Sequence, residues 1–322
     1  MSSDLPPLVS IIIPCFNAKD YILSAVENLI NQTYDNIEII IIDDASDDGT
    51  VELLKSFLKP SNVNIVYQKV NKGVAASRNA GILLAQGEYI MFLDADDKYD
   101  CSIIEKGISA IHGTECQVFC CAFEKTGMVN KNYAAADYND SIIAGKNYLD
   151  LIFNKKLYQH ICAMIIDVRL IKKYALQFDE GIAYSEDLLF IVRVMVNSKY
   201  IYYCNKPLFK YNIQSNSAMR REFKDERKHT LFVLTTIYDL INKYRHVCGN
   251  NVVEVFSIYA AITRLYLFKL AFKSGAKKNL LLEIITYPLP KIKLSSILKY
   301  NKKFLPYSVL SFLVEVVNGC KK

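Results

Sequence analysis

The sequence predicts an α/β fold, in which a mostly parallel sheet is covered by helices on both faces and followed by a helical C-terminal extension. Three observations predict it. Short runs rich in Ile and Val occur in the first hundred residues, as in buried parallel strands. Segments with apolar residues at helical spacing separate these runs. Near the C-terminus, lysines are interleaved with large apolar residues, which is typical of surface helices.

The elements follow in order along the chain. Four strands are expected, at Val9–Ile13, Ile37–Ile42, Val63–Tyr67 and Tyr89–Leu93. Three helices are expected between them: one on Ile22, Leu23, Val26, Leu29 and Ile30, one on Val51, Leu54 and Leu58, and one over Gly73 to Leu84. Strand and helix in alternation predict a parallel sheet with both faces covered.

A later helix is expected in "AYSEDLLFIVRVMVNSKY", where Ser185 would cap the helix that Glu186 opens. Its apolar face would consist of Leu188, Leu189, Val192 and Met195. Acids in a first turn are favoured by the helix dipole, which also keeps them ionised. Acids at helix starts are common, so this position alone does not indicate catalysis.

Polar residues follow three of the predicted strands: "PCFN" after the first, "DDASDDGT" after the second and "DADD" after the fourth. Ligands of such sheets bind beyond the carboxyl ends of the strands. Clustered acids repel one another unless a cation or a donor compensates them. Mg²⁺ or Mn²⁺ is the natural compensator, since both take carboxylate and phosphate oxygens. In the alternative interpretation, Asp96 and Asp97 form an Asx turn and cap the helix near Cys101.

Composition narrows the class of protein. The 322 residues are 52% hydrophobic, which is enough for one or two domains with a large core. Nine cysteines without a C-x-x-C pair indicate free, buried thiols in a reducing compartment. The N-terminus has no basic residue before a short apolar stretch that Pro14 interrupts, so it lacks the pattern of a secretory signal. We therefore expect a cytoplasmic protein.

The positive charge is concentrated in the C-terminal part. From Arg264 onward there are twelve Lys and Arg against two acids, a net charge of +10. Because the whole chain carries +6, residues 1–263 carry −4, which does not favour nucleic-acid binding. No stretch of this tail approaches the roughly 20 apolar residues that span a bilayer. The pattern predicts either contact with an anionic membrane surface or a solvated helical appendage.

Three segments carry a resemblance to a known family: "VSIIIPCFNAKDYILSAVENLINQTYDNIEIIIIDDASDDGT", "NKGVAASRNAGILLAQGEYIMFLDADD" and "SEDLLF". With these segments the chain from Leu8 to about Met219 resembles a family 2 glycosyltransferase of the GT-A fold. The resemblance implies a catalytic domain at residues 1–219, with a nucleotide-binding half (1–100) and an acceptor half (101–219). Residues 220–322 would be the helical, basic extension.

The resemblance implies roles for the first two loops. Pro14, Phe16 and Asn17 match the loop that meets the nucleotide, where an aromatic ring can stack on a uracil-like base. Asp44 matches the acid that accepts a hydrogen bond from the base. Asp43 would do the same or cap its turn.

It implies roles for the acids after the fourth strand as well. Arg78 matches a basic residue near the nucleotide. Asp94, with Ala95 beside it, would face the ribose. Asp96 would hold Mn²⁺ or Mg²⁺ across the two phosphates, with Asp97 as a third acid.

The E-D pair of the resemblance implies the catalytic base. Asp187 would deprotonate the acceptor hydroxyl, and Glu186 would position it or contact the acceptor; the two roles are exchangeable on the sequence alone. "YNIQSNSAMR" resembles the polar loop after this helix, in which Tyr211, Gln214 and Ser217 would contact phosphate or acceptor, or form a solvated linker. The chain has no tryptophan, so sugar stacking would fall to Tyr or Phe. His160 is expected to be a structural histidine.

The implied function is that of an inverting glycosyltransferase of the bacterial surface-polysaccharide type. It would move a hexosyl or N-acetylhexosaminyl group from a nucleotide-sugar, such as a UDP-sugar, to a glycan or a polyprenyl-diphosphate-linked acceptor. It would act peripherally on the inner face of the cell membrane. Two alternatives remain: a haloacid-dehalogenase-like phosphatase, whose D-x-D motif also follows an apolar strand, and a non-catalytic membrane-surface binding module. No G-x-G-x-x-G or G-x-x-x-x-G-K sequence occurs, which disfavours dinucleotide and P-loop nucleotide binding.

Overall fold

The computed structural model describes residues 6–135, 138–213, 225–276 and 278–288. It divides into two compact units, which are described separately. Unit 1 comprises Met1–Tyr148, Leu157–Ile182 and Glu186–Ser215, and unit 2 comprises Leu149–Lys156, Ala183–Ser185 and Asn216–Lys322. The predicted boundary between residues 219 and 220 lies outside the described residues, so the division into domains at that point stays a prediction.

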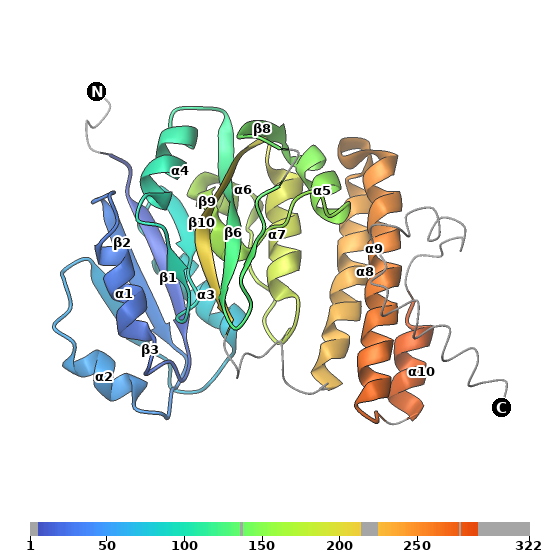
Figure 1. The fold of residues 1–322 in the computed structure, drawn as a ribbon, viewed down its shortest axis with the longest axis horizontal. Coiled ribbons are helices and arrows are strands. Elements are labelled where there is room, and N and C mark those ends of the chain that lie inside the picture. Colours follow the sequence, from blue (N-terminus) through green and yellow to red (C-terminus); the bar gives the residue numbers. More distant parts are fainter. Residues whose placement is uncertain (1–5, 136–137, 214–224, 277, 289–322) are drawn as a thin grey trace. The chain divides into compact units, whose positions relative to one another are not determined.

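Unit 1 is built on one sheet (Figure 1). In the described residues its main path runs β3-β2-β1-β4-β9-β6-β10-β5, with β7 paired to β6 and β8 paired to β10. The strands are β1 (Val9–Cys15), β2 (Ile37–Asp43), β3 (Val63–Tyr67), β4 (Tyr89–Phe92), β5 (Lys98–Tyr99), β6 (Cys116–Gly127), β7 (Lys131–Asn132), β8 (Ser141–Ala144), β9 (Met164–Asp167) and β10 (Tyr200–Ile213).

The first four strands confirm the predicted parallel arrangement. β1 pairs in parallel with β2 on one side and with β4 on the other. Successive side chains of a strand point to opposite faces, and Ile11, Ile12 and Ile13 are all fully buried. Both faces of the sheet are therefore covered here. The order 3-2-1-4 puts a change of direction between β1 and β4, where ligands of such sheets bind.

Beyond β4 the sheet is mixed. β9 runs antiparallel to both β4 and β6, while β6 and β10 are parallel to each other. The prediction of parallel pairing rested on the alternation of strand and helix in the first hundred residues, and that alternation does not continue. The antiparallel β9 has a consequence for the site, because it brings the chain before Met164 beside the end of β4.

Four helices of unit 1 occur where apolar spacing predicted them: α1 (Ile22–Ile30), α2 (Thr50–Ser56), α3 (Val74–Leu84) and α7 (Glu186–Asn197). The structure adds α4 (Ile103–Ile111) and α6 (Val168–Tyr174), while α5 (Gly145–Phe153) passes from unit 1 into unit 2. One expectation is wrong. α2 ends before Leu58, whose side chain is 95% exposed.

Helix α3 lies very close to β1. A Cβ atom on Gly81 would come within 2.3 Å of a methyl carbon of Ile12, so only glycine permits this approach. Residues three apart share a helix face, which directs Arg78 toward the sheet as well. The glycine thus brings a cation to the strand ends.

Unit 2 is helical, which confirms the predicted helical extension over the described residues. It contains α8 (His229–Lys243), α9 (Arg245–Lys273) and α10 (Lys278–Thr286). Its core includes Leu231, Leu267, Ala271 and Ile284. α9 is kinked at Gly249, whose φ of 81° and ψ of 161° are not helical.

One helix of the described residues, Cys248–Lys273, is long and apolar enough to cross a membrane by length and composition. Half of its apolar window is buried within the protein, and the core helix of a globular protein passes the same test. It begins before the basic tail, of which residues 289–322 lie outside the described part of the chain.

Candidate functional site

The acids after β4 form a tight turn. The amide of Asp97 donates to the carbonyl of Asp94 at 3.0 Å. The Asp97 side chain is 1% exposed, and its Oδ1 accepts from the amide of Asn212 in β10 at 2.8 Å. Its Oδ2 is buried and has no hydrogen-bond partner among the described residues. This carboxylate therefore links two strands and still has one oxygen to satisfy.

The alternative in which Asp96 and Asp97 cap the next helix is wrong. The N-cap residue of α4 is Ser102, which has no side-chain cap hydrogen bond. Asp100 forms the turn before it, since its Oδ1 accepts from the amide of Ser102 at 3.0 Å. Asp96 and Asp97 remain beside the strand ends.

The three acids of the D-x-D-D segment differ in their electrostatic surroundings. Burial, and then Asp94, raise the pKa of Asp96. Burial, followed by Asp94 and Asp96, raises the pKa of Asp97 well above its usual range. Burial is the largest influence on Asp94 and acts to raise its pKa, but Arg78, His160 and the hydrogen bonds to this carboxyl together lower it. Asp94 is thus compensated, whereas Asp96 and Asp97 lack a counter-charge.

Arg78 connects two acids that lie far apart in the sequence. Its Nη2 is 2.9 Å from Oδ1 of Asp94, and its Nη1 is 3.2 Å from Oε1 of Glu186. The Arg78 side chain is 4% exposed and lies over the ring of Phe178. Burial opposes its charge, but Asp94 and then Glu186 raise its pKa further. The predicted cation thus joins the D-x-D segment to the E-D segment.

The E-D pair opens α7, as predicted. Glu186 is buried, and burial followed by the charge of Asp187 raises its pKa to about 7, although Arg78 acts in the opposite direction. Asp187 is partly exposed, and its Oδ1 accepts from the amide of Leu188 at 2.7 Å. Two adjacent carboxyl groups therefore have different environments.

Ser185 does not have the expected capping geometry. Its φ of 67° is left-handed rather than the extended backbone of an N-cap residue. Its hydroxyl lies 3.2 Å from that of Thr230. A serine with positive φ is uncommon, and such residues often occur at functional sites.

In the loop after β2 both predicted acids are already hydrogen-bonded. Asp43 accepts from the hydroxyl and the amide of Ser46, which is the turn-capping alternative. Asp44 accepts from the amides of Lys72 and Gly73 at 2.8 Å each. Both side chains are buried. They hold the loops around the strand ends, and a contact of Asp44 with a base stays a prediction.

The loop after β1 is more accessible. Phe16 is 51% exposed, Asn17 is exposed, and Pro14 is partly buried. Asn17 has a φ of 51°, and its side chain exchanges hydrogen bonds with Asp47 at 2.8 and 3.0 Å. The aromatic ring is thus presented on a loop that the second loop holds in place.

Two neighbours of the acids come from the segment before β9. His160 is structural, as expected: its Nδ1 accepts from the amide of Cys162 at 3.2 Å, and its ring stacks on Phe209. Burial lowers its pKa, against the attraction of Asp94. Cys162 was interpreted only as a small buried residue, yet its sulfur lies within 4.8 Å of ligand atoms of Asp94 and Asp97. No sequence signal indicated this, because the contact depends on the pairing of β4 with β9.

Tyr211 of the predicted polar loop also belongs to this group. Its ring centroid lies 5.1 Å from that of His160. Burial, and then Asp97 and Asp94, raise its pKa to about 12. Gln214 and Ser217, predicted in the same loop, lie outside the described residues.

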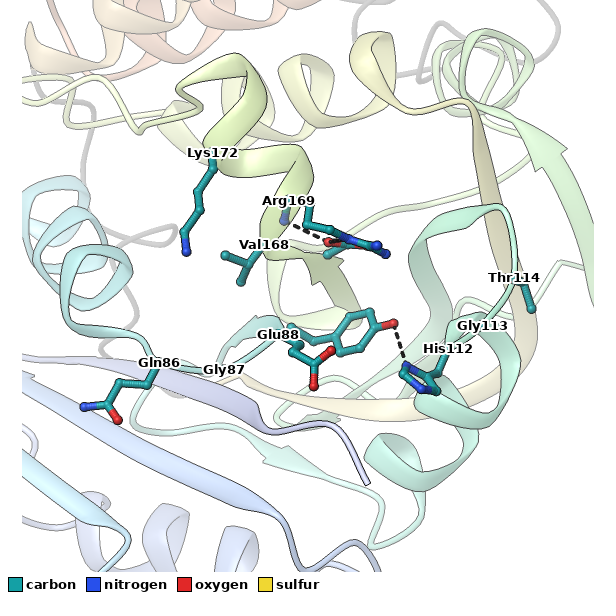
Figure 2. A pocket seen from close by; sticks show the side chains of 11 residues that line it. Gln86, Gly87, Glu88, His112, Gly113, Thr114, Val168, Arg169 and Lys172 are labelled. Atoms are coloured by element: carbon teal, nitrogen blue, oxygen red, sulfur yellow. Dashed lines mark hydrogen bonds and ion pairs between the residues drawn. The ribbon is translucent and has the colours of Figure 1, made fainter. Parts of the chain in front are cut away.

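A separate pocket lies at the opposite end of β4. Figure 2 shows Glu88, His112, Arg169 and Lys172 around this cavity of about 550 Å³. Arg169 is paired with Asp167 at 2.6 Å. None of the residues predicted for the site lines this pocket, so it is not the crevice that the acids occupy.

Comparisons with known proteins point in one direction. The family model described as "Glycosyl transferase family 2" matches residues 10–175. The putative glycosyltransferase EpsH of Bacillus subtilis (strain 168) is 30% identical over 221 residues, covering 67% of this chain and 63% of EpsH. WfaP of Escherichia coli is 47% identical over 90 residues, covering 28% of this chain and 36% of WfaP. Its name is UDP-Glc:alpha-D-GlcNAc-diphosphoundecaprenol beta-1,3-glucosyltransferase.

A solved structure agrees on the fold. Residues 1–349 of S. aureus TarS in complex with UDP-GlcNAc match with a TM-score of 0.73 at 17% identity, covering 94% of this chain and 82% of that one. The chain spans less than two thirds of the length of EpsH and of WfaP.

Proposed function

Because this chain belongs to glycosyl transferase family 2, we propose that it transfers a hexosyl or N-acetylhexosaminyl group from a UDP-sugar to a glycan or a polyprenyl-diphosphate-linked acceptor. The transfer inverts the anomeric centre and serves the synthesis of a bacterial surface polysaccharide. The observation that carries the proposal is the meeting of Asp94 and Glu186 at one buried arginine. This contact joins the proposed nucleotide-binding segment to the acid that directly precedes the proposed base. The complexes of TarS with UDP-GlcNAc and the name of WfaP support the donor and acceptor classes.

The donor would lie beyond the ends of β1 and β4. Phe16 stacks on the base, with Pro14 and Asn17 shaping the loop, and Asp94 with Ala95 faces the ribose. Support comes from the exposure of Phe16 and from the partly exposed carboxyl of Asp94. Arg78 acts on the nucleotide indirectly, because its guanidinium is buried in two ion pairs and orients Asp94.

The acids fit a divalent cation. Asp96 is partly exposed, Asp97 keeps one buried oxygen without a hydrogen-bond partner among the described residues, and burial followed by the neighbouring acids raises the pKa of each. Asp96, with Asp97, would hold Mn²⁺ or Mg²⁺, which when bound stabilises the charge on the leaving diphosphate as a Lewis acid.

We assign the catalytic base to Asp187. A base must be ionised and must reach the acceptor hydroxyl. Glu186 is buried against Arg78, and its pKa of about 7 leaves much of it protonated at neutral pH. Asp187 is partly exposed at the start of a helix, where the dipole favours its charge. Glu186 then positions its neighbour.

The phosphatase alternative is not supported, since the matching family model includes residues 94–97. The non-catalytic alternative makes an opposite prediction for Asp96, which the following experiment tests.

We expect a panel of nucleotide-sugars to show UDP release with a UDP-sugar and Mn²⁺, and much less after chelation. Asp96→Asn should lower this turnover by about 10²–10³-fold, because the leaving charge loses its stabilisation. Nucleotide release and thermal stabilisation by UDP would be measured together.

Asp35→Asn is the matched control, because Asp35 is an exposed acid before the first residue of β2, at the opposite end of that strand from the site. Unchanged turnover in Asp96→Asn would contradict a role of Asp96 in catalysis, and no turnover by the native protein with any nucleotide-sugar would support the binding module instead. Hydrolysis of a phosphate ester without response to any UDP-sugar would overturn the proposed function.

We further propose that the protein acts at the cytoplasmic face of a membrane, held by basic and apolar residues of its C-terminal part. Phe232, Tyr266, Phe272 and Leu282 of the described helices are each about half exposed, and the net charge from Arg264 onward is +10. Each basic residue near an anionic leaflet contributes about 1 kcal/mol.

The expected result is co-sedimentation with vesicles rich in anionic lipid, weakened by high salt because surface charges are screened. Zwitterionic vesicles are the control. Equal binding to both kinds of vesicle, or to neither, would contradict an electrostatic membrane contact.

A further inference from the structure

A buried cluster below the D-x-D-D turn has ligand groups of two chemical kinds. One atom each of Asp94, Asp97 and Cys162 lies within 4.8 Å of the others, among the described residues. Asp97 and Cys162 are almost completely buried. The cluster arises because Cys162, in the 3-10 turn Ile161–Ala163, precedes β9, which pairs with β4.

The second observation is the unpaired oxygen of Asp97. Its Oδ1 is held by the amide of Asn212, while the buried Oδ2 has no hydrogen-bond partner among the described residues. A buried polar atom without a partner costs about 1–3 kcal/mol, and more when it is charged, so such atoms call for an explanation. A cation bound in the cluster would supply the missing partner.

The charges of the residues around the turn also favour a bound cation. Asp94, Asp96 and Asp97 lie in one turn, and Arg78 is the cation paired with Asp94. The single positive charge of Arg78 is already shared by two ion pairs, one with Asp94 and one with Glu186. Without a further cation, the two acids that follow Asp94 have no positive partner among the ion pairs of the described residues.

We propose that Asp94, Asp97 and Cys162 form a second divalent-cation site beside the ion held by Asp96, with Asp97 shared between the two sites, and that the thiol makes this second site prefer Zn²⁺ or Cd²⁺ to Mg²⁺. Sulfur ligands select softer ions, whereas Mg²⁺ takes oxygen ligands almost exclusively. Metal–ligand distances of about 2.0–2.3 Å require the three atoms to close by about 1 Å at most. On binding, the thiol releases its proton to solvent and binds as thiolate.

This second site rests on the metal binding in the proposed function, but metal binding can be measured without measuring enzyme turnover. Cd²⁺ bound to a thiolate gives a charge-transfer band in the near ultraviolet. We expect one equivalent of Cd²⁺ to produce this band in a Cys101→Ser/Cys320→Ser background, which removes an exposed thiol and the thiol near the C-terminus. Adding Cys162→Ser should abolish the band.

Cys121→Ser in the same background is the matched control, because Cys121 is an equally buried thiol outside the cluster. It should keep the band. By calorimetry, Cys162→Ser should also reduce the preference for Zn²⁺ over Mg²⁺ by about tenfold or more.

If Cys162→Ser does not fold, Asp97→Asn tests the same metal site. Asparagine can still accept from the amide of Asn212, and the thiol is intact, so a folded variant should bind Cd²⁺ about tenfold more weakly or worse. A band that survives Cys162→Ser, or a background protein that shows none, overturns the proposal. Cys162 would then be a hydrogen-bond donor to Asp94 only. Either result leaves UDP release by the native protein as a separate question.

Discussion

Replacing Asp187 by asparagine should lower kcat by about 10²–10⁴-fold, the usual contribution of a general base. Asparagine has nearly the same shape but cannot take the proton of the acceptor hydroxyl. The KM for the donor should change little, because Asp187 is assigned to the acceptor side. Steady-state UDP release at saturating donor, with and without acceptor, measures both quantities.

Glu186→Gln separates the two carboxyl groups. We expect a smaller loss of kcat, because a glutamine can still accept from Arg78 and position its neighbour. Asp179→Asn, at an acid paired with Arg193 away from the E-D pair, is the control for a general effect of removing charge. A large loss in Glu186→Gln together with a near-normal Asp187→Asn would exchange the two roles. Near-normal kcat in both variants would contradict any role of this pair as base.

The second large effect concerns stability. Arg78→Met should lower the free energy of unfolding by about 3–5 kcal/mol, because it leaves Asp94 and Glu186 without their common partner at a buried position. It also removes the contact of the guanidinium with Phe178. Urea unfolding followed by circular dichroism gives the magnitude.

Arg193→Met is the matched control. Arg193 lies 2.8 Å from Asp179, and these two side chains are 25% and 37% exposed, against 4% for Arg78. Exposed pairs contribute about 0–1 kcal/mol, so this variant should be nearly as stable as the native protein. Adding Glu186→Gln to Arg78→Met should restore part of the loss, since it removes one of the unpaired acids. An equal decrease in the free energy of unfolding in Arg78→Met and Arg193→Met would show that the buried ion pairs of Arg78 stabilise the protein no more than the Arg193 pair does.

The structure of the first hundred residues was predictable because the sequence signals there are local. Apolar runs such as Val9 to Ile13 and the alanine-rich helix around Gly81 have the period of the element they form, and strands β1 to β4 occur where expected. Errors occurred where a local pattern had two solutions. Asp97 bonds to β10 and does not cap α4, whose N-cap residue is Ser102, and Ser185 has a left-handed backbone, although Asp97 and Ser185 would be ordinary caps by sequence.

Contacts between distant segments were not predictable. Arg78 and Glu186 are 108 residues apart, and Asp97 and Asn212 are 115 residues apart. The role of Arg78 near the nucleotide followed from the resemblance, yet its burial between two acids depends on how closely α3 approaches β1. The hydrogen bonds of Asp44 were not predictable for the same reason, because the loop that contains Lys72 and Gly73 meets Asp44 only in the folded chain.

The sequence by itself determined the α/β class, the parallel strands β1 to β4 and the presence of acids at their ends, since each depends on a repeat of a few residues. Tertiary structure alone decided which acids have partners. The antiparallel pairing of β4 with β9 puts Cys162 beside Asp94 and Asp97, and the register of β10 puts the amide of Asn212 on Asp97. The physical reason is that burial and charge depend on neighbours in space, which a local pattern does not specify.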